Sequence, residues 1–272
     1  MKPVTFSYHR ATSLEEALAW LVDYPEGKIL AGGQSMVPMM NYRLARPEFV
    51  LDINRIPGLD YVERSNDRIR IGGLLRHQQL HENPIVRECL PALAEAAGEV
   101  GHWAIRNRGT LGGSLAHADP ASELPAAMVA FGATLELCGA DGIRKVPAED
   151  FYLGFLMTAL EPGEILTGVE IPLHSGTCYG FAEIARRAGD FALAGAYVET
   201  RDNGEGAVTW FGISGRPERR ELLFAQDEEA RKTQFTELVS ELESLEEGTY
   251  RQRLGVVVAE QAYKKARGGN KA

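Results

Sequence analysis

Residues 28–38 (KILAGGQSMVP) constrain the fold of this chain more than any other stretch. Residues 29–31 form an apolar run of strand length, and the two glycines that follow allow positive φ and leave no Cβ between the backbone and a ligand. Free backbone N–H groups at such a turn, followed by the start of a helix, form a concave site for an anion. The stretch therefore predicts a buried strand, an anion-binding turn and a short helix, in that order.

A second glycine stretch, residues 108–114 (RGTLGGS), again places two glycines beside a hydroxyl. Neither stretch is a GxGxxG sequence, and neither carries the lysine of a P-loop, so a nucleotide would be held in some other way. A single Gly-Gly-polar sequence is more often an ordinary turn. The pair leaves two interpretations open, a divided anion site or two plain turns. The hydroxyls of Ser35, Thr110 and Ser114 are either ligand donors or local caps.

The charge of the chain argues against nucleic-acid binding. It has 272 residues, of which 29 are basic and 38 acidic, giving a formal charge of -9. No basic cluster stands out that could neutralise phosphates along a nucleic-acid backbone. An anionic cofactor would therefore have to be held by local amides. The length and a hydrophobic content of 44% suit two or three subdomains, each with a core.

The cysteines predict no metal site in this chain. Cys89, Cys138 and Cys178 are odd in number and far apart, without a CxxC pair. This spacing supports neither a disulfide framework nor an iron–sulfur or zinc site.

The N-terminus lacks an apolar core of signal-peptide length, and no stretch reaches 18 apolar residues, so we expect a cytoplasmic protein without a transmembrane segment.

The order of the elements predicts an α+β chain. A capped helix from residue 13 to 24 leads to the first glycine stretch, and residues 49–53 supply the second strand of a compact βαβ unit. Strands and helices then mix up to residue 172. A clear hairpin follows at 195–213, and two amphipathic helices are expected at 232–245 and 250–266. We expect an N-terminal domain at 1–175, with subdomains of about 1–56 and 57–175, and a C-terminal domain at 176–272.

Short motifs in a fixed order give the chain a family resemblance. It resembles the FAD-binding medium subunits of the molybdenum hydroxylases, the family of carbon monoxide and xanthine dehydrogenases, over about residues 4–215. The motifs are residues 31–38 (AGGQSMVP), 43–45 (RLA), 52–53 (DI), 71–73 (IGG), 105–107 (IRN), 110–120 (TLGGSLAHADP), 123–125 (ELP) and 186–192 (RRAGDFA). Only the last ~55 residues lack a motif that can be placed.

The resemblance implies a fold and a set of cofactor-binding residues. The fold would be a two-subdomain FAD-binding domain of the vanillyl-alcohol oxidase type, also called PCMH-type, followed by a small α/β C-terminal domain. The first loop and its strand would wrap the FAD pyrophosphate, the second loop and Gly101 would lie along it, Glu123 would bind ribityl or ribose hydroxyls, and Leu166 would pack on the adenine or the ring. The residues implied are Ile29, Leu30, Ala31, Gly32, Gly33, Gln34, Ser35, Met36, Gly101, Thr110, Leu111, Gly112, Gly113, Ser114, His117, Glu123 and Leu166.

The resemblance also implies an electron-transfer role. Molybdopterin would lie in a large partner subunit and 2Fe–2S clusters in a small one, in a dimer of heterotrimers, and FAD in this chain would pass electrons to an external acceptor. No side chain here need act as a catalytic acid or base. Two alternatives remain: a stand-alone flavin oxidoreductase of the vanillyl-alcohol oxidase type, and a nucleotide-binding module without redox chemistry.

Three further expectations concern a histidine pair, a short segment and two glycines. His77 and His81, four residues apart, are interpreted as an exposed helical pair, because no HExxH pattern supports metal binding. Residues 103–108 (WAIRNR) have the composition of a partner interface, with Arg106 and Arg108 at its rim. A Cβ at Gly33 or Gly112 is expected to intrude on backbone donors that face the pyrophosphate.

Overall fold

The computed structural model describes residues 1–245 and 247–268, and its N-terminal part is a small parallel sheet. The strand order is β1-β3-β2, with both pairs parallel. Ser13 caps the first helix by accepting a hydrogen bond from the backbone N–H of Glu16, as the sequence predicts. The chain then runs through β2, the first glycine loop and α2 into β3, which confirms the βαβ unit. The bounds are β1 (Ser7–Arg10), α1 (Leu14–Asp23), β2 (Lys28–Leu30), α2 (Met36–Asn41) and β3 (Phe49–Asp52).

The middle part is a five-stranded antiparallel sheet in the order β4-β5-β10-β6-β7. Its strands are β4 (Val62–Arg64), β5 (Arg68–Gly72), β6 (Thr134–Gly139), β7 (Gly142–Pro147) and β10 (Ile165–Pro172). The helices that accompany it are α3 (His77–Glu82), α4 (Pro84–Cys89), α5 (Pro91–Glu99), α6 (Trp103–Arg106), α7 (Leu111–His117), α8 (Glu123–Ala130) and α9 (Ala148–Phe151). A short hairpin of β8 (Tyr152–Gly154) and β9 (Met157–Thr158) follows α9.

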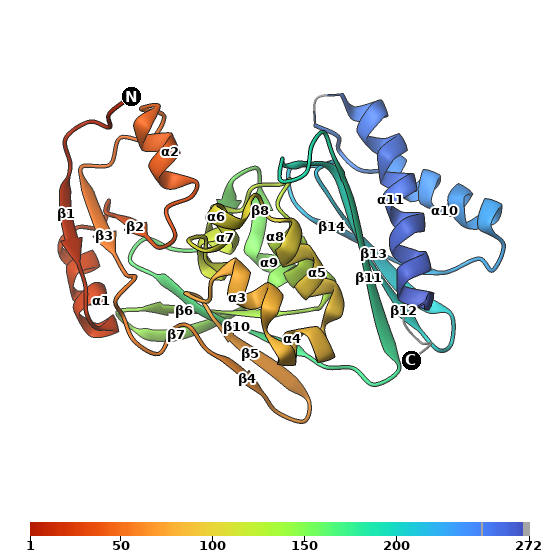
Figure 1. Ribbon diagram of the computed structural model, residues 1–272, viewed down its shortest axis with the longest axis horizontal. Helices are drawn as coiled ribbons and strands as arrows, with labels where there is room; N and C mark the ends of the chain where they lie inside the picture. Colours follow the sequence, from red (N-terminus) through yellow and green to blue (C-terminus); the bar gives the residue numbers. More distant parts are fainter. Residues whose placement is uncertain (246, 269–272) are drawn as a thin grey trace.

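The C-terminal part is a four-stranded antiparallel sheet with two helices on its outer face (Figure 1). The strands are β11 (Thr177–Ala185), β12 (Ala192–Arg201), β13 (Glu205–Phe211) and β14 (Glu218–Leu223), and the helices are α10 (Glu228–Ser240) and α11 (Gly248–Gly268). The predicted hairpin is β12–β13, in which Val198 pairs with Val208. Helix α10 starts earlier than predicted because Asp227 caps it, its carboxylate accepting from the N–H of Ala230.

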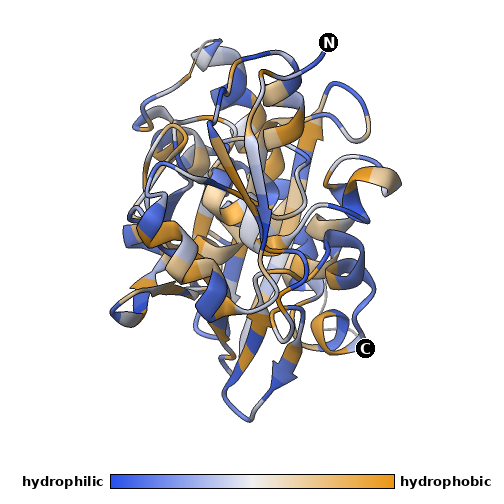
Figure 2. Cartoon of the chain, turned by 90° about the vertical axis from the view of Figure 1, so that its left-hand side faces the viewer, coloured by the Kyte–Doolittle hydropathy of each residue, from blue (hydrophilic) through white to orange (hydrophobic). Residues whose placement is uncertain are grey.

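The inner face of this C-terminal sheet shares a hydrophobic core with the middle part. Phe131, which follows α8, packs edge-on against Tyr179 of β11 and Tyr197 of β12, with ring centroids 4.6 and 5.7 Å apart. The outer face packs on α10 and α11, which a buried ion pair between Arg231 and Glu260 joins at 2.7 Å. Figure 2 shows the apolar residues on strands and helices and the hydrophilic ones in many of the loops around them. In the described part of the chain, the mixture of one parallel and three antiparallel sheets with helices confirms the α+β class.

Candidate functional site

The first glycine loop presents a row of unused backbone donors. Within the described residues, the N–H groups of Gly32, Gly33, Gln34 and Ser35 donate no hydrogen bond to the protein. Gly33 has φ of +70°, a conformation that L side chains rarely adopt. The Ser35 side chain does not cap α2. Consecutive free amides of this kind are the donors that an anion-binding turn needs.

The two glycine loops lie against each other. A Cβ built on Gly32 would come within 2.7 Å of the Cα of Gly109, and one built on Gly113 would come within 3.9 Å of the Cβ of Ala31. Gly32 and Gly109 are both buried. The two stretches therefore pack directly against each other, so that a single ligand would reach both.

The amides of the second loop are used inside the protein. The N–H of Leu111 donates to Leu75 O, and the N–H of Gly112 donates to Gly73 O, at 2.9 and 2.8 Å. Thr110 caps α7, since its Oγ1 accepts from the N–H of Gly113 at 3.1 Å, and the N–H of Ser114 donates to Thr110 O. The expectation that both loops offer amides to an anion is therefore wrong for residues 111–114. The Ser114 hydroxyl is the polar donor that this part of the loop has left.

Gly112 faces the backbone of the middle part, contrary to the expectation that it faces free donors. A Cβ on Gly112 would lie 2.8 Å from Gly73 O and 3.1 Å from Gly73 Cα. It would meet the backbone of the middle part and would not intrude on free donors. Gly112 is a glycine because α7 packs closely on the turn after β5.

A polar network joins the two loops, and no sequence pattern pointed to it. Arg76 donates through Nη1 to Arg108 O at 2.6 Å and through Nη2 to Asn54 Oδ1 at 2.8 Å. Asn54 in turn donates through Nδ2 to Ala31 O at 2.7 Å. Burial, and then the charge of Arg108, lower the pKa of Arg76. The network spans both loops, so it fixes their spacing.

The interpretation of His77 as exposed is wrong. Its side chain is buried, and Nε2 lies 2.9 Å from Thr110 O and 3.0 Å from Ser114 Oγ. His81, which is partly buried, contacts Ala94 O through Nδ1 at 2.8 Å. Sequence spacing alone could not show this, because the ring of His77 fits against Gly109, far away in the chain.

The remaining candidate residues lie around this centre. Ile29 and Leu30 are in β2, Met36 begins α2 and His117 ends α7 with its side chain partly exposed. Gly101 has φ of +53° and accepts a hydrogen bond from Arg106. Leu166 lies in the main hydrophobic core, and its carbonyl oxygen would be 2.5 Å from a Cβ on Gly73.

Glu123 is a buried acid at the start of α8. Only 4% of it is exposed. Burial, and then the neighbouring carboxylate of Glu183, raise the pKa of Glu123 to about 8. Tyr197 donates to its backbone carbonyl at 3.2 Å. A carboxyl group that is protonated near neutral pH can donate as well as accept, which suits a partner with hydroxyl groups.

The segment 103–108 is only partly as expected. Trp103 is 66% exposed, and Arg108 is exposed. Arg106 is turned into the chain, where it donates through Nε to Gln78 at 2.9 Å and through Nη1 to Gly101 O at 3.0 Å. The rim role predicted for Arg106 is therefore wrong, and this residue holds the Gly101 turn.

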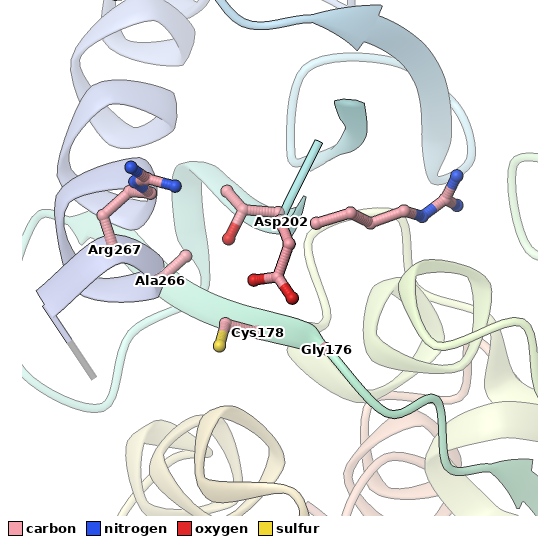
Figure 3. A pocket seen from close by; sticks show the side chains of 7 residues that line it. Gly176, Cys178, Asp202, Ala266 and Arg267 are labelled. Carbon is pink, nitrogen blue, oxygen red and sulfur yellow. The ribbon is translucent and has the colours of Figure 1, made fainter. Parts of the chain in front are cut away.

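Other features of the described residues point to no second site of this kind. A pocket of about 140 Å³ between β11 and the end of α11, lined by Cys178, Asp202 and Arg267 among others, includes none of the candidate residues (Figure 3). In the described part of the chain, no three His, Cys, Asp or Glu side chains gather as metal ligands. None of the described helices is long and apolar enough to span a bilayer.

Comparison with known proteins identifies the family. Residues 4–174 match the family described as FAD binding domain in molybdopterin dehydrogenase. The chain is 44% identical over 198 residues to the 6-hydroxypseudooxynicotine dehydrogenase complex subunit alpha of Paenarthrobacter nicotinovorans, covering 72% of this chain and 67% of the relative. It is 41% identical over 206 residues to the carbon monoxide dehydrogenase medium chain of Hydrogenophaga pseudoflava, covering 75% and 72%.

Solved structures extend the likeness to the whole chain. A structure of carbon monoxide dehydrogenase from Hydrogenophaga pseudoflava superposes with a TM-score of 0.93 at 33% identity, covering 98% of this chain and 99% of that one. Quinoline 2-oxidoreductase from Pseudomonas putida 86 gives a TM-score of 0.92 at 33% identity over all of both chains. The described residues of the C-terminal segment, which has no recognisable motif, therefore adopt the fold of these relatives.

The glycine loops fit the cofactor that this family binds. Among the described residues the amides of residues 32–35 have no acceptor, which suits a pyrophosphate, and the absence of a Cβ on Gly32 lets the second loop close against the first. The βαβ unit, the antiparallel middle sheet and the C-terminal sheet all lie within the part of the chain that superposes on the solved carbon monoxide dehydrogenase. The chain belongs to the family of FAD-binding medium subunits of the molybdenum-containing dehydrogenases.

Proposed function

We propose that this chain is the electron-transfer subunit of a molybdenum hydroxylase. It would take electrons from 2Fe–2S clusters of a small partner subunit and pass them to an external acceptor, while a large partner subunit holds molybdopterin. The observation that carries the proposal is the row of four unused amides at residues 32–35, closed off by the second glycine loop. When FAD is bound, its isoalloxazine supplies the redox chemistry, and the protein supplies position and access.

The proposed binding residues differ in the part of FAD that each would contact or position. The amides of residues 32–35 and the Ser114 hydroxyl would hold the pyrophosphate, and the protonated Glu123 would bind a ribityl or ribose hydroxyl. Gly101 and Thr110 would shape the second loop, and Leu166 would line the apolar side. This arrangement suits a chain with a formal charge of -9, because it needs no basic side chain.

We further propose the assembly and its boundaries. The relatives named above are subunits and medium chains, which supports a heteromeric complex, for which we propose a dimer of heterotrimers in the cytoplasm. We propose that the FAD-binding domain covers residues 1–175, in subdomains of about 1–56 and 57–175, and that the C-terminal domain covers 176–272. The exposed Trp103 and Arg108 are our proposal for part of a partner contact near the flavin.

An absorption spectrum of the purified chain, followed by reduction in the assembled complex, tests this function. We expect the bands of oxidised flavin, no turnover by the chain alone, and bleaching of the flavin by substrate only when the partner subunits are present. Substrate turnover without partners would favour a stand-alone flavin oxidoreductase. A colourless chain that cannot be loaded with FAD would favour a nucleotide-binding module without redox chemistry.

A further inference from the structure

His77 ties α3 to the second glycine loop by three contacts. Its backbone N–H donates to Gly109 O at 3.1 Å. Its ring nitrogen Nε2 lies 2.9 Å from Thr110 O and 3.0 Å from Ser114 Oγ. The side chain is 3% exposed, and a Cβ on Gly109 would come within 2.7 Å of Nδ1, so the glycine makes room for the ring.

The chemistry of these partners fixes the tautomer of the ring. A carbonyl oxygen can only accept a hydrogen bond, so Nε2 carries the hydrogen that points to Thr110 O. Nδ1 is buried and has no partner among the described residues, so it has nothing to stabilise a second proton. Burial lowers the pKa of His77 to about 4, and the ring is neutral at neutral pH. The Nε2–H group is therefore shared between Thr110 O and Ser114 Oγ.

This sharing decides what the Ser114 hydroxyl can do. A serine within a helix commonly turns its hydroxyl back to the carbonyl four residues earlier, which here is Thr110 O. That carbonyl already accepts from the backbone N–H of Ser114 at 3.1 Å and from His77. Since Ser114 Oγ accepts from the same Nε2–H group, its own hydrogen is left for an acceptor outside the helix. Ser114 is partly exposed, so such an acceptor can reach it.

We propose that His77 is a positioning residue for the cofactor, which keeps the Ser114 hydroxyl from bonding to Thr110 O and so directs its hydrogen to the FAD pyrophosphate. The inference rests on the proposed function of the two loops. His77 itself touches no cofactor in this account. It acts through Ser114, and the amides of residues 32–35 supply the other donors.

A double-mutant cycle on FAD affinity tests the proposal in the full chain. The dissociation constant of FAD is measured by flavin fluorescence for the wild type, His77→Leu, Ser114→Ala and the double variant, and the thermal midpoint of each chain without FAD is recorded separately. We expect each single substitution to weaken binding by roughly tenfold or more, as the loss of one hydrogen bond to a charged group does. The double variant should be no weaker than Ser114→Ala, because His77 acts only through the serine.

His77→Gln is the matched rescue. Its amide N–H can reach both oxygens, so FAD affinity should stay within about threefold of the wild type. A purely structural histidine would lower the thermal midpoint and leave the effect of Ser114→Ala intact. Additive losses in the double variant, or a Gln variant as weak as His77→Leu, would overturn the proposal.

The design separates this inference from the proposed function. A wild-type chain that binds no FAD contradicts the function itself. If the wild type binds FAD and His77→Leu binds it with the same affinity, only the role of His77 is contradicted. Should His77→Leu fail to fold, Ser114→Ala and His77→Gln still decide, because a Ser114→Ala chain with wild-type affinity would overturn the proposal.

Discussion

Gly32 and Gly109 approach so closely that a Cβ on Gly32 would lie 2.7 Å from the Cα of Gly109. These residues belong to glycine loops more than 70 residues apart in the sequence. The contact is between backbones, which cannot move aside as a flexible side chain can. The two halves of the proposed FAD site can therefore pack against each other only because Gly32 has no Cβ.

Gly32→Ala is expected to force these loops apart. We predict that FAD affinity falls at least tenfold and that the free energy of unfolding falls by about 1–3 kcal/mol, as overpacking costs. Gly154→Ala is the matched control, since nothing lies within 4 Å of a Cβ there. Flavin titration and urea unfolding of both variants check the prediction. A Gly32→Ala chain that behaves like the control would show that the loops tolerate separation.

Gly112→Ala should affect stability first. Its Cβ would meet Gly73 O at 2.8 Å, so we expect a loss of about 1–3 kcal/mol in the free energy of unfolding even without FAD. Urea unfolding of the FAD-free chain measures this. The prediction fails if the variant is as stable as the wild type and only its flavin content is reduced, because Gly112 would then face the cofactor.

The buried acid Glu123 predicts a pH dependence of folding. Its pKa is raised to about 8 by burial and then by Glu183, so the protonated form is favoured in the folded state. Its contribution to stability is fully present below the unfolded pKa of 4.5 and is lost as the pH rises through about 8. Glu123→Gln keeps the shape of the side chain and removes this loss of stability at high pH, because the amide does not ionise.

We therefore expect the stability of Glu123→Gln, relative to the wild type, to rise between about pH 5 and about pH 9 in the FAD-free chain. Glu183, whose pKa is raised to about 7 mainly by burial, titrates in both chains, so its own loss of stability with rising pH cancels from this difference. Glu26→Gln, at an exposed position, serves as the control for the loss of one carboxylate. A difference for Glu123→Gln that does not change with pH would contradict the burial argument.

A cut in the exposed link between β10 and β11 should leave the two parts associated. Residues 174–176 are exposed, whereas Phe131 packs on Tyr179 and Tyr197 across the junction. Limited proteolysis should give two fragments on a denaturing gel that elute together in size-exclusion chromatography. Fragments that separate, or a chain that resists cutting near residue 175, would speak against the boundary or the shared core.

The parts of the fold that the sequence predicted rest on local signals. The Ser13 cap, the strand before Gly32 and the β12–β13 hairpin are specified by residues within a few positions of one another, and all are present. The predicted α10 ended later than the observed one because amphipathic spacing marks boundaries poorly. Strand β1 was not predicted. It is short and mostly exposed, and it forms through pairing with β3.

The chemistry of the site was less predictable because it depends on distant partners. Both glycine loops look alike in sequence, yet the amides of Leu111 and Gly112 are used by Leu75 O and Gly73 O, whereas those of residues 32–35 stay free. The burial of His77 depends on the space beside Gly109. The roles of Arg76 and Asn54 depend on carbonyls of both loops meeting at one place. None of these contacts leaves a periodic pattern in the sequence.

In the proposed complex, residues 32–35 hold the FAD pyrophosphate with their backbone amides. The most direct test is the amide NMR spectrum of the ¹⁵N-labelled full chain without FAD and at saturation. We predict that the proton signals of Gly32, Gly33, Gln34 and Ser35 move downfield and become protected from exchange, while those of Leu111 and Gly112, already bonded inside the protein, change little. Unchanged signals for residues 32–35 in a chain with FAD fully bound would contradict the account.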